Sequence, residues 1–307
     1  MGSAIKMGAG QGEVHHGEAH KWRAYLICPY GSHVKIATWN ILHGMAVPKG
    51  VIDNEQLIQG AVALDVDILA IQEVDFFQER SHYVDQCALI AEGLGASFIS
   101  RGIALRGTPG QRWEKFHTSE VNSTQLTRES GMYYGNGIIS RIPILNEFRL
   151  ELGRSKVGLP LAVPQTSPGA AKPKIKLIYI HDEPRVAHAV LLENGITVIN
   201  THLSFVPGMN FVQLRKIHHW VQSLPGKKIL VGDFNLPGKL PSKIMKWKSA
   251  AEQFTYPSWG AKVQFDHILT ENSEIKIERK LQFVQGAAWV SDHLPLGVEF
   301  SLASGTR

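Results

Sequence analysis

The tetrad Gly232-Asp233-Phe234-Asn235 follows directly on the apolar run Lys227–Val231. Side chains alternate between the two faces of a β-strand, so Asp233 and Asn235 are expected to leave the same side of a strand where it ends. A carboxylate and a carboxamide brought together in this way indicate a functional site at the rim of a β-sheet.

Four further segments join a short β-type run to polar residues: Thr38-Trp39-Asn40, Ile71-Gln72-Glu73, Asn200-Thr201-His202 and Ser291-Asp292-His293. The first three runs are expected to stop at their last residue, whereas the fourth segment opens the last hydrophobic stretch of the chain. Together the five strand ends would bring carboxylates, carboxamides and two imidazoles to one rim. Oxygen donors suit Mg2+ and imidazoles suit proton transfer, so these residues favour hydrolysis of a phosphate ester.

In the order WN, QE, NG, NTHL, GDFN, DHIL and SDH, these motifs resemble the endonuclease/exonuclease/phosphatase superfamily from about Val34 to Leu302. The superfamily contains deoxyribonucleases, AP endonucleases, deadenylases, neutral sphingomyelinases and inositol polyphosphate 5-phosphatases. The resemblance implies a four-layer α/β/β/α sandwich with two packed mixed β-sheets and the site at one edge. The order of the expected elements agrees with an α+β class, because strands run both consecutively and in alternation with helices.

Composition is ordinary for a globular protein, with 44% hydrophobic and 19% charged residues among 307. Because the motifs extend from Asn40 to His293, two domains would divide the site, so we expect a single catalytic domain over residues 33–307. Residues 1–32 are expected to form a poorly ordered polar arm. Cys28 and Cys87 fit neither a disulfide framework nor a zinc site.

Several expectations concern location and local structure. No apolar stretch approaches the ~18 residues of a transmembrane helix, and the N-terminus lacks the apolar centre of a signal peptide. We therefore expect a cytoplasmic location without stable membrane insertion; the alternative is a secreted form whose leader is absent from this sequence. We also expect a monomer. Apolar spacing predicts helices over Asp53–Leu64, Tyr83–Leu94 and Phe211–Leu224. Arg101–Gly131 is interpreted as a long functional loop, and Gly153–Pro173 as a second insertion.

Three residues are the predicted metal ligands. Glu73 follows an apolar run, where a carboxylate must be solvated, paired or bound to a cation; the alternative is an exposed strand-end glutamate. Asn40 would contribute a carbonyl oxygen, although an asparagine before Ile41 also suits a turn. The resemblance adds Asp292 as a ligand on the opposite flank. Mg2+ is the expected ion, with Mn2+ as a substitute, and members of the superfamily differ in whether one or two ions bind.

The catalytic assignments come from the resemblance. It implies that Asp266, in Asp266-His267-Ile268-Leu269, orients His293, which takes a proton from water; the alternative is that Asp266 caps a turn. Asp233 and Asn235 would position the water and hold the phosphate. His202 would act on the scissile phosphate or the leaving oxygen, and its presence argues against an AP endonuclease. An isolated strand histidine is otherwise usually structural.

Substrate contacts are predicted at Asn136, which matches the NG motif, and at Arg185, whose guanidinium suits a phosphate or a surface salt bridge. The formal charge of +5 is compatible with an anionic substrate. A nuclease acting on DNA or RNA would use the basic and aromatic residues of the long loop and a later lysine run: Arg101, Arg106, Arg112, Trp113, Lys115, Phe116, Arg128, Lys239, Lys243, Lys246 and Lys248. The alternatives are a phospholipid or inositol-phosphate hydrolase, and a non-catalytic phosphate-binding module.

Overall fold

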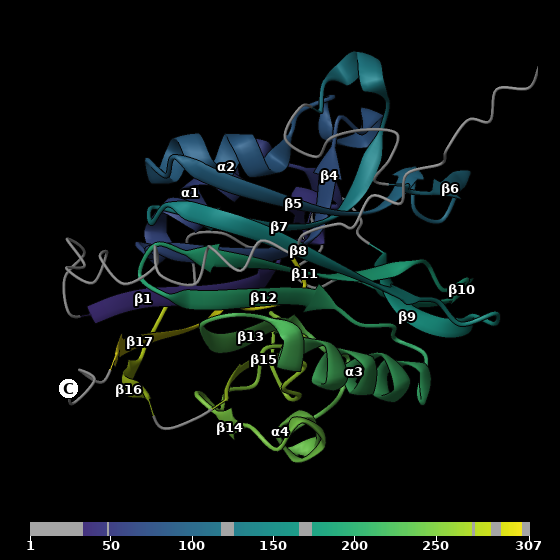
Figure 1. Ribbon diagram of the computed structural model, residues 1–307. Helices are drawn as coiled ribbons and strands as arrows, with labels where there is room; N and C mark the ends of the chain where they lie inside the picture. The colour runs from purple at the N-terminus through teal and green to yellow at the C-terminus, as the bar shows by residue number, and fades with distance from the viewer. Residues whose placement is uncertain are drawn as a thin grey trace, which may run out of the picture.

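The computed structural model describes residues 33–47, 49–117, 126–165, 174–271, 274–283 and 290–302. The expected N-terminal arm and Cys28 lie outside this part of the chain. Two large β-sheets stack face to face, and helices cover their outer faces (Figure 1). This arrangement confirms the four-layer sandwich.

The first sheet has seven strands in the spatial order β16-β17-β1-β4-β7-β5-β6. Their bounds are β1 (His33–Asn40), β4 (Ile68–Phe76), β5 (Phe98–Gly107), β6 (Trp113–Lys115), β7 (Tyr133–Ser140), β16 (Ile275–Lys280) and β17 (Leu296–Leu302). Strands β1 and β4 run parallel, and the other neighbours pair antiparallel, so the sheet is mixed.

The second sheet has six strands in the order β14-β15-β13-β12-β11-β8. Their bounds are β8 (Ile144–Gly153), β11 (Arg185–Leu192), β12 (Ile196–His202), β13 (Lys227–Asp233), β14 (Lys248–Ser249) and β15 (Asp266–Thr270). Here β12 and β13 are the parallel pair. Two small sheets pair β2 (Met45–Ala46) with β3 (Val51–Ile52), and β9 (Leu159–Gln165) with β10 (Lys174–Ile180).

Helices α1 (Asn54–Leu64) and α2 (Gln86–Leu94) cover the first sheet, while α3 (Met209–Trp220) and α4 (Leu240–Met245) cover the second (Figure 1). Short 3-10 turns lie at Leu42–Gly44, Glu79–Ser81, Arg128–Ser130 and Val221–Ser223. Among the described residues, no helix is both long and apolar enough to span a membrane.

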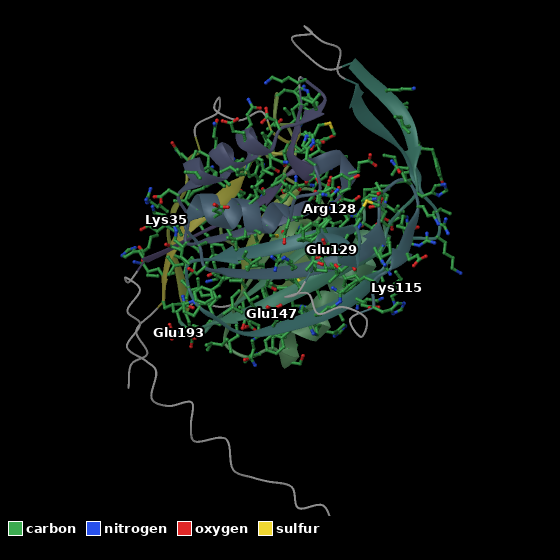
Figure 2. All side chains as sticks on the ribbon, turned by 90° about the horizontal axis from the view of Figure 1, so that it is seen from above. Lys35, Lys115, Arg128, Glu129, Glu147 and Glu193 are labelled. Carbon is green, nitrogen blue, oxygen red and sulfur yellow. The ribbon has the colours of Figure 1, made fainter. Side chains whose placement is uncertain are left out.

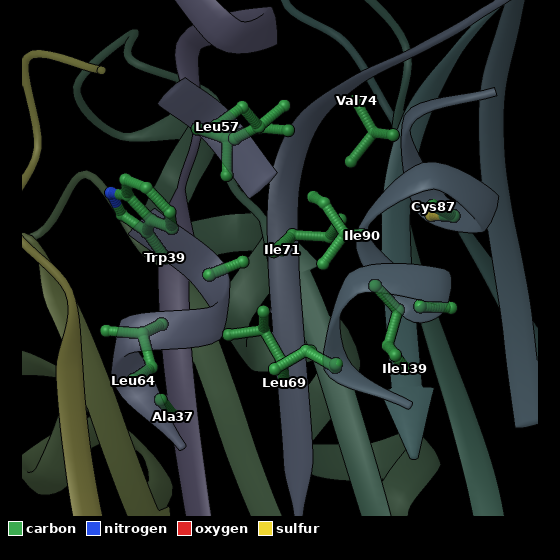
Figure 3. Close-up of a cluster of buried hydrophobic side chains, with 14 of the residues drawn as sticks. Ala37, Trp39, Leu57, Leu64, Leu69, Ile71, Val74, Cys87, Ile90 and Ile139 are labelled. Carbon is green, nitrogen blue, oxygen red and sulfur yellow. The ribbon is translucent and has the colours of Figure 1, made fainter. Parts of the chain in front are cut away.

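Strand alternation divides the core between the layers. In β4, Leu69 and Ile71 face α1 and α2 (Figure 3), whereas Ile68 and Ala70 face the second sheet. In the same way, Leu230 of β13 packs in the cluster beneath α3, while its neighbours pack between the sheets. Two-residue periodicity therefore gives each central strand two buried faces, as a sandwich covered by helices requires.

Local signals explain which helix predictions hold. Helix α1 begins after Asp53, whose carboxylate accepts a hydrogen bond from Gln56 N at 2.9 Å, and it ends at Leu64 as predicted. Helix α2 begins at Gln86 rather than Tyr83, because Tyr83 has a φ of 57° and Asp85 caps the helix. Gly95 ends α2 with a φ of 63°, the left-handed conformation expected of a terminating glycine.

The interpretation of Arg101–Gly131 as one long loop is wrong in its first part. Residues up to Gly107 continue β5, and Trp113–Lys115 pairs back onto that strand as β6. The cause is the buried stretch Gly102–Leu105, which sustains the strand although it lies between two arginines. Residues 118–125 lie outside the described part of the chain. The second predicted insertion likewise contains the strand β9.

His188 makes the stability of the sandwich sensitive to pH. It lies buried in β11, and its ring contacts Gly102 of β5 so closely that a Cβ at Gly102 would overlap it. Burial, reinforced by the positive charge of Arg149, lowers the pKa of His188 to about 3.

Below its ordinary pKa of 6.5 the histidine of the unfolded chain takes up a proton, whereas the folded one stays neutral, so stability is lost as pH falls. This single group is expected to remove about 2 kcal/mol of unfolding free energy between pH 7 and pH 5. Urea denaturation of the wild type and of His188→Leu at both pH values tests this. The decrease in unfolding free energy from pH 7 to pH 5 should be about 2 kcal/mol smaller in His188→Leu than in the wild type. An equal pH dependence in the two proteins would contradict this assignment.

Candidate active site

Strand register in the second sheet brings three site residues side by side. Parallel pairing of β12 with β13 sets His202 opposite Asp233, and antiparallel pairing of β13 with β15 sets Asp233 opposite Asp266. All three are at most 6% exposed. Asp233 therefore occupies the middle of a row, with an imidazole on one side and a second carboxylate on the other.

The tetrad is shaped by its neighbours. Gly232 has a φ of 140°, and a Cβ at this position would overlap the carbonyl oxygen of Thr201 on β12. Phe234 is fully buried among the side chains beneath α3. Burial of Phe234 turns Asp233 and Asn235 to the opposite side, where both line one pocket as predicted. The carboxylate of Asp233 also accepts a hydrogen bond from Asn235 N at 2.9 Å.

Glu73 does not end its strand, contrary to expectation. Strand β4 continues to Phe76, and its pairing with β7 is interrupted by a bulge between Ile71 and Val74. Glu73 lies in this bulge with a φ of 59°. A left-handed conformation is costly for a residue with a side chain, and bulges commonly redirect side chains near functional sites. Here the bulge directs the carboxylate into the pocket.

Asn40 connects the two sheets at the site. Its Nδ2 donates hydrogen bonds to Glu73 Oε1 and to Asp233 Oδ2, both at 3.0 Å. Its Oδ1 accepts a hydrogen bond from Leu42 N at 3.1 Å. Asn40 therefore faces the carboxylates with its nitrogen, whereas the predicted metal ligation needs its oxygen. The side-chain amide would have to turn over to act as a ligand.

His293 is held from several directions. Its Nδ1 lies 2.8 Å from Asp266 Oδ2, and its Nε2 lies 3.6 Å from Asp233 Oδ2. The indole Nε1 of Trp39 donates to the carbonyl oxygen of His293 at 3.1 Å. Burial tends to lower the pKa of His293, but Asp266 and Asp233 outweigh it and raise the pKa well above its usual range. Both ring nitrogens therefore face carboxylate oxygens, which favours the protonated ring.

His202 is buried as deeply as His293, but its pKa is shifted in the opposite direction. Its Nδ1 lies 2.9 Å from Nη1 of Arg185. A guanidinium can only donate, so Nδ1 is the acceptor and Nε2 carries the ring proton. Burial, then the positive charges of Arg185 and His293, lower the pKa of His202 well below its usual range. Nε2 lies 3.5 Å from Asp233 Oδ2 and 3.2 Å from Asn235 Nδ2, so two N–H donors face the same region.

These groups line a pocket of about 700 Å³. The predicted residues on its wall are Glu73, Arg185, His202, Asp233, Asn235, Asp292 and His293. Asn40 and Asp266 lie behind the wall and hold residues that form it. Asn136 is not part of the wall, because its Nδ2 donates to the carbonyl oxygen of Val186 at 3.2 Å across the two sheets.

The pocket wall also contains residues that sequence reasoning missed, among them Arg80, Tyr134, Glu183 and Tyr256. Arg80 forms a bidentate ion pair with the fully buried Asp75, at 2.7 and 2.8 Å. Tyr134 lies two residues before Asn136, and Glu183 lies two residues before Arg185. Their spacing from these predicted residues could have identified them, because alternate residues of an extended chain share a face. Arg80 lies in a polar segment that carries no comparable signal.

Carboxylates dominate the end of the pocket that could hold a cation. Asp233, Asp266 and His293 place ligand atoms within 4.8 Å of one another, which is compatible with a metal ion. However, Asp266 and His293 already bond to each other. Glu73 and Asp292 are the freer oxygen donors: Asp292 Oδ1 is buried without a hydrogen-bond partner among the described residues. Burial, with repulsion from Glu73, raises the pKa of Asp292 to about 6. A divalent cation would relieve this repulsion, so the donor set fits one.

Arg185 is expected to control the protonation of His202. Arg185→Met keeps the length of the side chain but removes its charge and donors, so the pKa of His202 should rise toward its ordinary value, while burial keeps it below. NMR titration of labelled histidines, assigned with His202→Asn, measures this shift. Arg154→Met, which removes an exposed arginine elsewhere, serves as the control. If the pKa of His202 is the same in Arg185→Met as in the wild type, burial alone lowers that pKa.

Several solved structures share the fold of this chain. Similar structures include an endonuclease/exonuclease/phosphatase from Beutenbergia cavernae, at 18% identity and a TM-score of 0.57, covering 89% of this chain and 72% of that one. ANGEL2, a 2',3'-cyclic phosphatase, matches at 16% identity and 0.59, covering 89% and 96%. The human Nocturnin catalytic domain matches at 18% and 0.55, covering 88% and 94%.

At these identities, the similarity to the three structures shows a shared fold only. A search of curated proteins finds no match. Residues 37–293 match the Endonuclease/Exonuclease/phosphatase family, and the match includes every motif residue from Asn40 to His293. The chain therefore belongs to the endonuclease/exonuclease/phosphatase family, whose members hydrolyse phosphate esters.

Proposed function

We propose that the protein is a phosphodiesterase that requires Mg2+, or Mn2+ in its place, and attacks phosphorus with water in line. The observation that carries the proposal is the position of Asp233 between two imidazoles: its Oδ2 lies 3.6 Å from Nε2 of His293 and 3.5 Å from Nε2 of His202. One acceptor flanked by two N–H donors suits a water that loses a proton while negative charge grows on a phosphoryl group.

We propose for His293 a role other than the expected proton acceptor. Both of its ring nitrogens face carboxylate oxygens, which favours the doubly protonated ring, and such a ring has no lone pair to accept a proton. We assign proton acceptance to Asp233, and assign to His293 a positive N–H that stabilises the phosphoryl oxygens. Asp266 keeps that ring oriented and charged.

His202 and Asn235 contribute on the other side of Asp233. His202 presents a neutral N–H because Arg185 occupies its other nitrogen. Asn235 Nδ2 donates to the carbonyl oxygen of Leu203 at 3.0 Å, which fixes its side chain. Both N–H groups are therefore preorganised donors for a substrate oxygen. Glu73 and Asp292, with Asn40 if its amide turns, would hold the cation, which neutralises charge on the phosphoryl and leaving oxygens when bound.

The nuclease interpretation loses part of its basis. Arg101 is paired with Asp85 at 2.7 Å, Phe116 is buried, and Lys115 is paired with Glu151 at 2.6 Å. Lys239 is likewise paired with Glu252, at 3.5 Å. Similarity to ANGEL2 does not select a substrate, because that protein's 2',3'-cyclic phosphatase activity is one chemistry of a varied family. We therefore propose phosphodiester hydrolysis. Among the substrate classes, we favour a phospholipid, because of apolar and basic side chains exposed near the pocket.

Glu73→Gln tests the metal requirement, because it keeps the shape of the side chain but removes its charge. Turnover of bis-p-nitrophenyl phosphate with Mg2+ or Mn2+ should fall at least 100-fold, and calorimetry should show weaker metal binding. Glu92→Gln, an exposed glutamate on α2, is the control and should retain both properties. Metal binding unchanged in Glu73→Gln would exclude Glu73 as a ligand, and a wild-type enzyme active in a chelator would refute the metal requirement.

His293 and Asp266 are expected to act as one unit. His293→Ala or Asp266→Ala should each lower kcat by roughly 10²–10⁴-fold. The double variant should be scarcely slower than the worse single variant, because removing either group removes the oriented imidazolium. Steady-state kinetics of the three variants on the same diester measure this. If the two losses multiply, Asp266 does not act through His293.

A further inference from the structure

The small β9–β10 sheet stands apart from the sandwich. Its two strands pair with each other, from Lys174 opposite Gln165 to Ile180 opposite Leu159, and with no other described strand. The hairpin extends beyond the body of the molecule (Figure 2). Ile180, at its base, lines the pocket together with Phe205 and Pro207. The hairpin therefore starts at the entrance of the active site.

Hydrogen bonds fix the base of this hairpin relative to the catalytic residues. Asp182 Oδ2 accepts from Ser155 N at 2.6 Å and from Ser204 Oγ at 2.8 Å. Ser155 and Asp182 lie on the two arms leading to the hairpin, and Ser204 follows His202 by two residues. One buried carboxylate thus connects both arms to the end of β12, so the direction of the hairpin is set by the active site.

The second strand of the hairpin and the segment before the first strand expose apolar side chains. Leu177 is 71% exposed, Tyr179 is 54% exposed and the nearby Val157 is 59% exposed, with Ile178 also exposed at 38%. Leu177 and Ile178 are consecutive, so they point to opposite faces of the strand. Both faces are therefore open to solvent there. Leu177 and Tyr179 share one face, and neighbouring exposed apolar side chains of this kind mark surfaces that bind a partner or a membrane.

The same segment carries the positive charge of the protein. Between Gly153 and Ile180 the sequence has five basic residues and no acidic one: Arg154, Lys156, Lys172, Lys174 and Lys176. The formal charge of the whole chain is +5, so the remainder is formally neutral. Arg154, Lys156 and Lys176 are exposed in the structure. Lysines beside exposed aliphatic side chains match a surface that is anionic outside and apolar just beneath.

We propose that the β9–β10 hairpin docks peripherally on an anionic lipid bilayer and presents the pocket to phosphodiesters of lipid headgroups. The inference rests on the proposed phosphodiesterase function for the substrate, but the docking itself does not require turnover. Leu177, Ile178 and Val157 enter the interfacial region, while Arg154, Lys156 and Lys176 contact lipid phosphates. A nucleic acid would engage the lysines but would leave these aliphatic side chains in water, so the bilayer accounts for more of the surface.

Sedimentation of the full-length protein with lipid vesicles, in chelator so that no lipid is hydrolysed, tests the docking. Vesicles of phosphatidylcholine with about a third phosphatidylglycerol should bind at least tenfold more protein than vesicles of phosphatidylcholine alone, and added salt should release it. Leu177→Gln and Lys176→Gln should each weaken binding, roughly tenfold for Leu177→Gln because no leucine side chain would then leave water for the bilayer on docking. Val62→Gln on α1 and Lys243→Gln on α4 are the matched controls and should bind like the wild type.

Thermal denaturation verifies that each variant is folded. Binding absent from anionic vesicles, or weakened as much by the control substitutions as by Leu177→Gln, would overturn the proposal. The same would follow if the hairpin variants lost affinity for a fluorescent oligonucleotide while no vesicle binding was found, which would assign the surface to nucleic acid. Vesicle binding without turnover of any diester would instead leave the docking intact and refute the phosphodiesterase function.

Discussion

The active site depends on a polar contact between two sheets that otherwise meet through apolar side chains. Asn40 in the first sheet donates to Asp233 in the second, and beneath it Gln72 donates to Asn200 Oδ1 at 2.8 Å. Asn200 in turn donates to the carbonyl oxygens of Ile71 and Gly137 at 3.0 and 2.8 Å. Apolar packing tolerates small shifts of one sheet over the other, whereas buried polar groups must meet their partners. These bonds therefore fix how Glu73 and Asp233 face each other.

Burial acts to lower the pKa of both His202 and His293, and their charged partners account for the difference between them. His202 and His293 are both nearly inaccessible, and both are near Asp233. His293 has Asp266 behind it and is charged, whereas His202 has Arg185 behind it and is neutral. Two identical side chains thus offer a positive donor and a neutral donor on either side of one carboxylate. Environment separates their roles as it separates pKa values in other active sites.

Sequence patterns predicted those parts of the site that local signals determine. The ends of β1, β12 and β13, at Asn40, His202 and Asp233, follow from apolar runs that stop at polar residues. The bulge at Glu73 could not be predicted, because no residue type marks a positive φ there. The direction of Asn136, toward Val186 in the other sheet, likewise depends on how the sheets pack. The protonation of His293 required knowing that its second nitrogen faces Asp233.

Negative charge gathers at the pocket and positive charge at the segment that contains the β9–β10 hairpin, which suggests a different role for each. Glu73, Asp233, Asp266 and Asp292 lie together at one end of the site, so under the proposed function this end would repel an anionic ester until a cation is bound. Long-range attraction must then come from elsewhere on the surface, and the excess positive charge lies on the segment that contains the hairpin. Because Asp182 links the base of the hairpin to the end of β12, a headgroup held there lies beside the pocket. The proposal thereby assigns attraction of the substrate and activation of water to different parts of the chain, which hydrogen bonds of Asp182 connect.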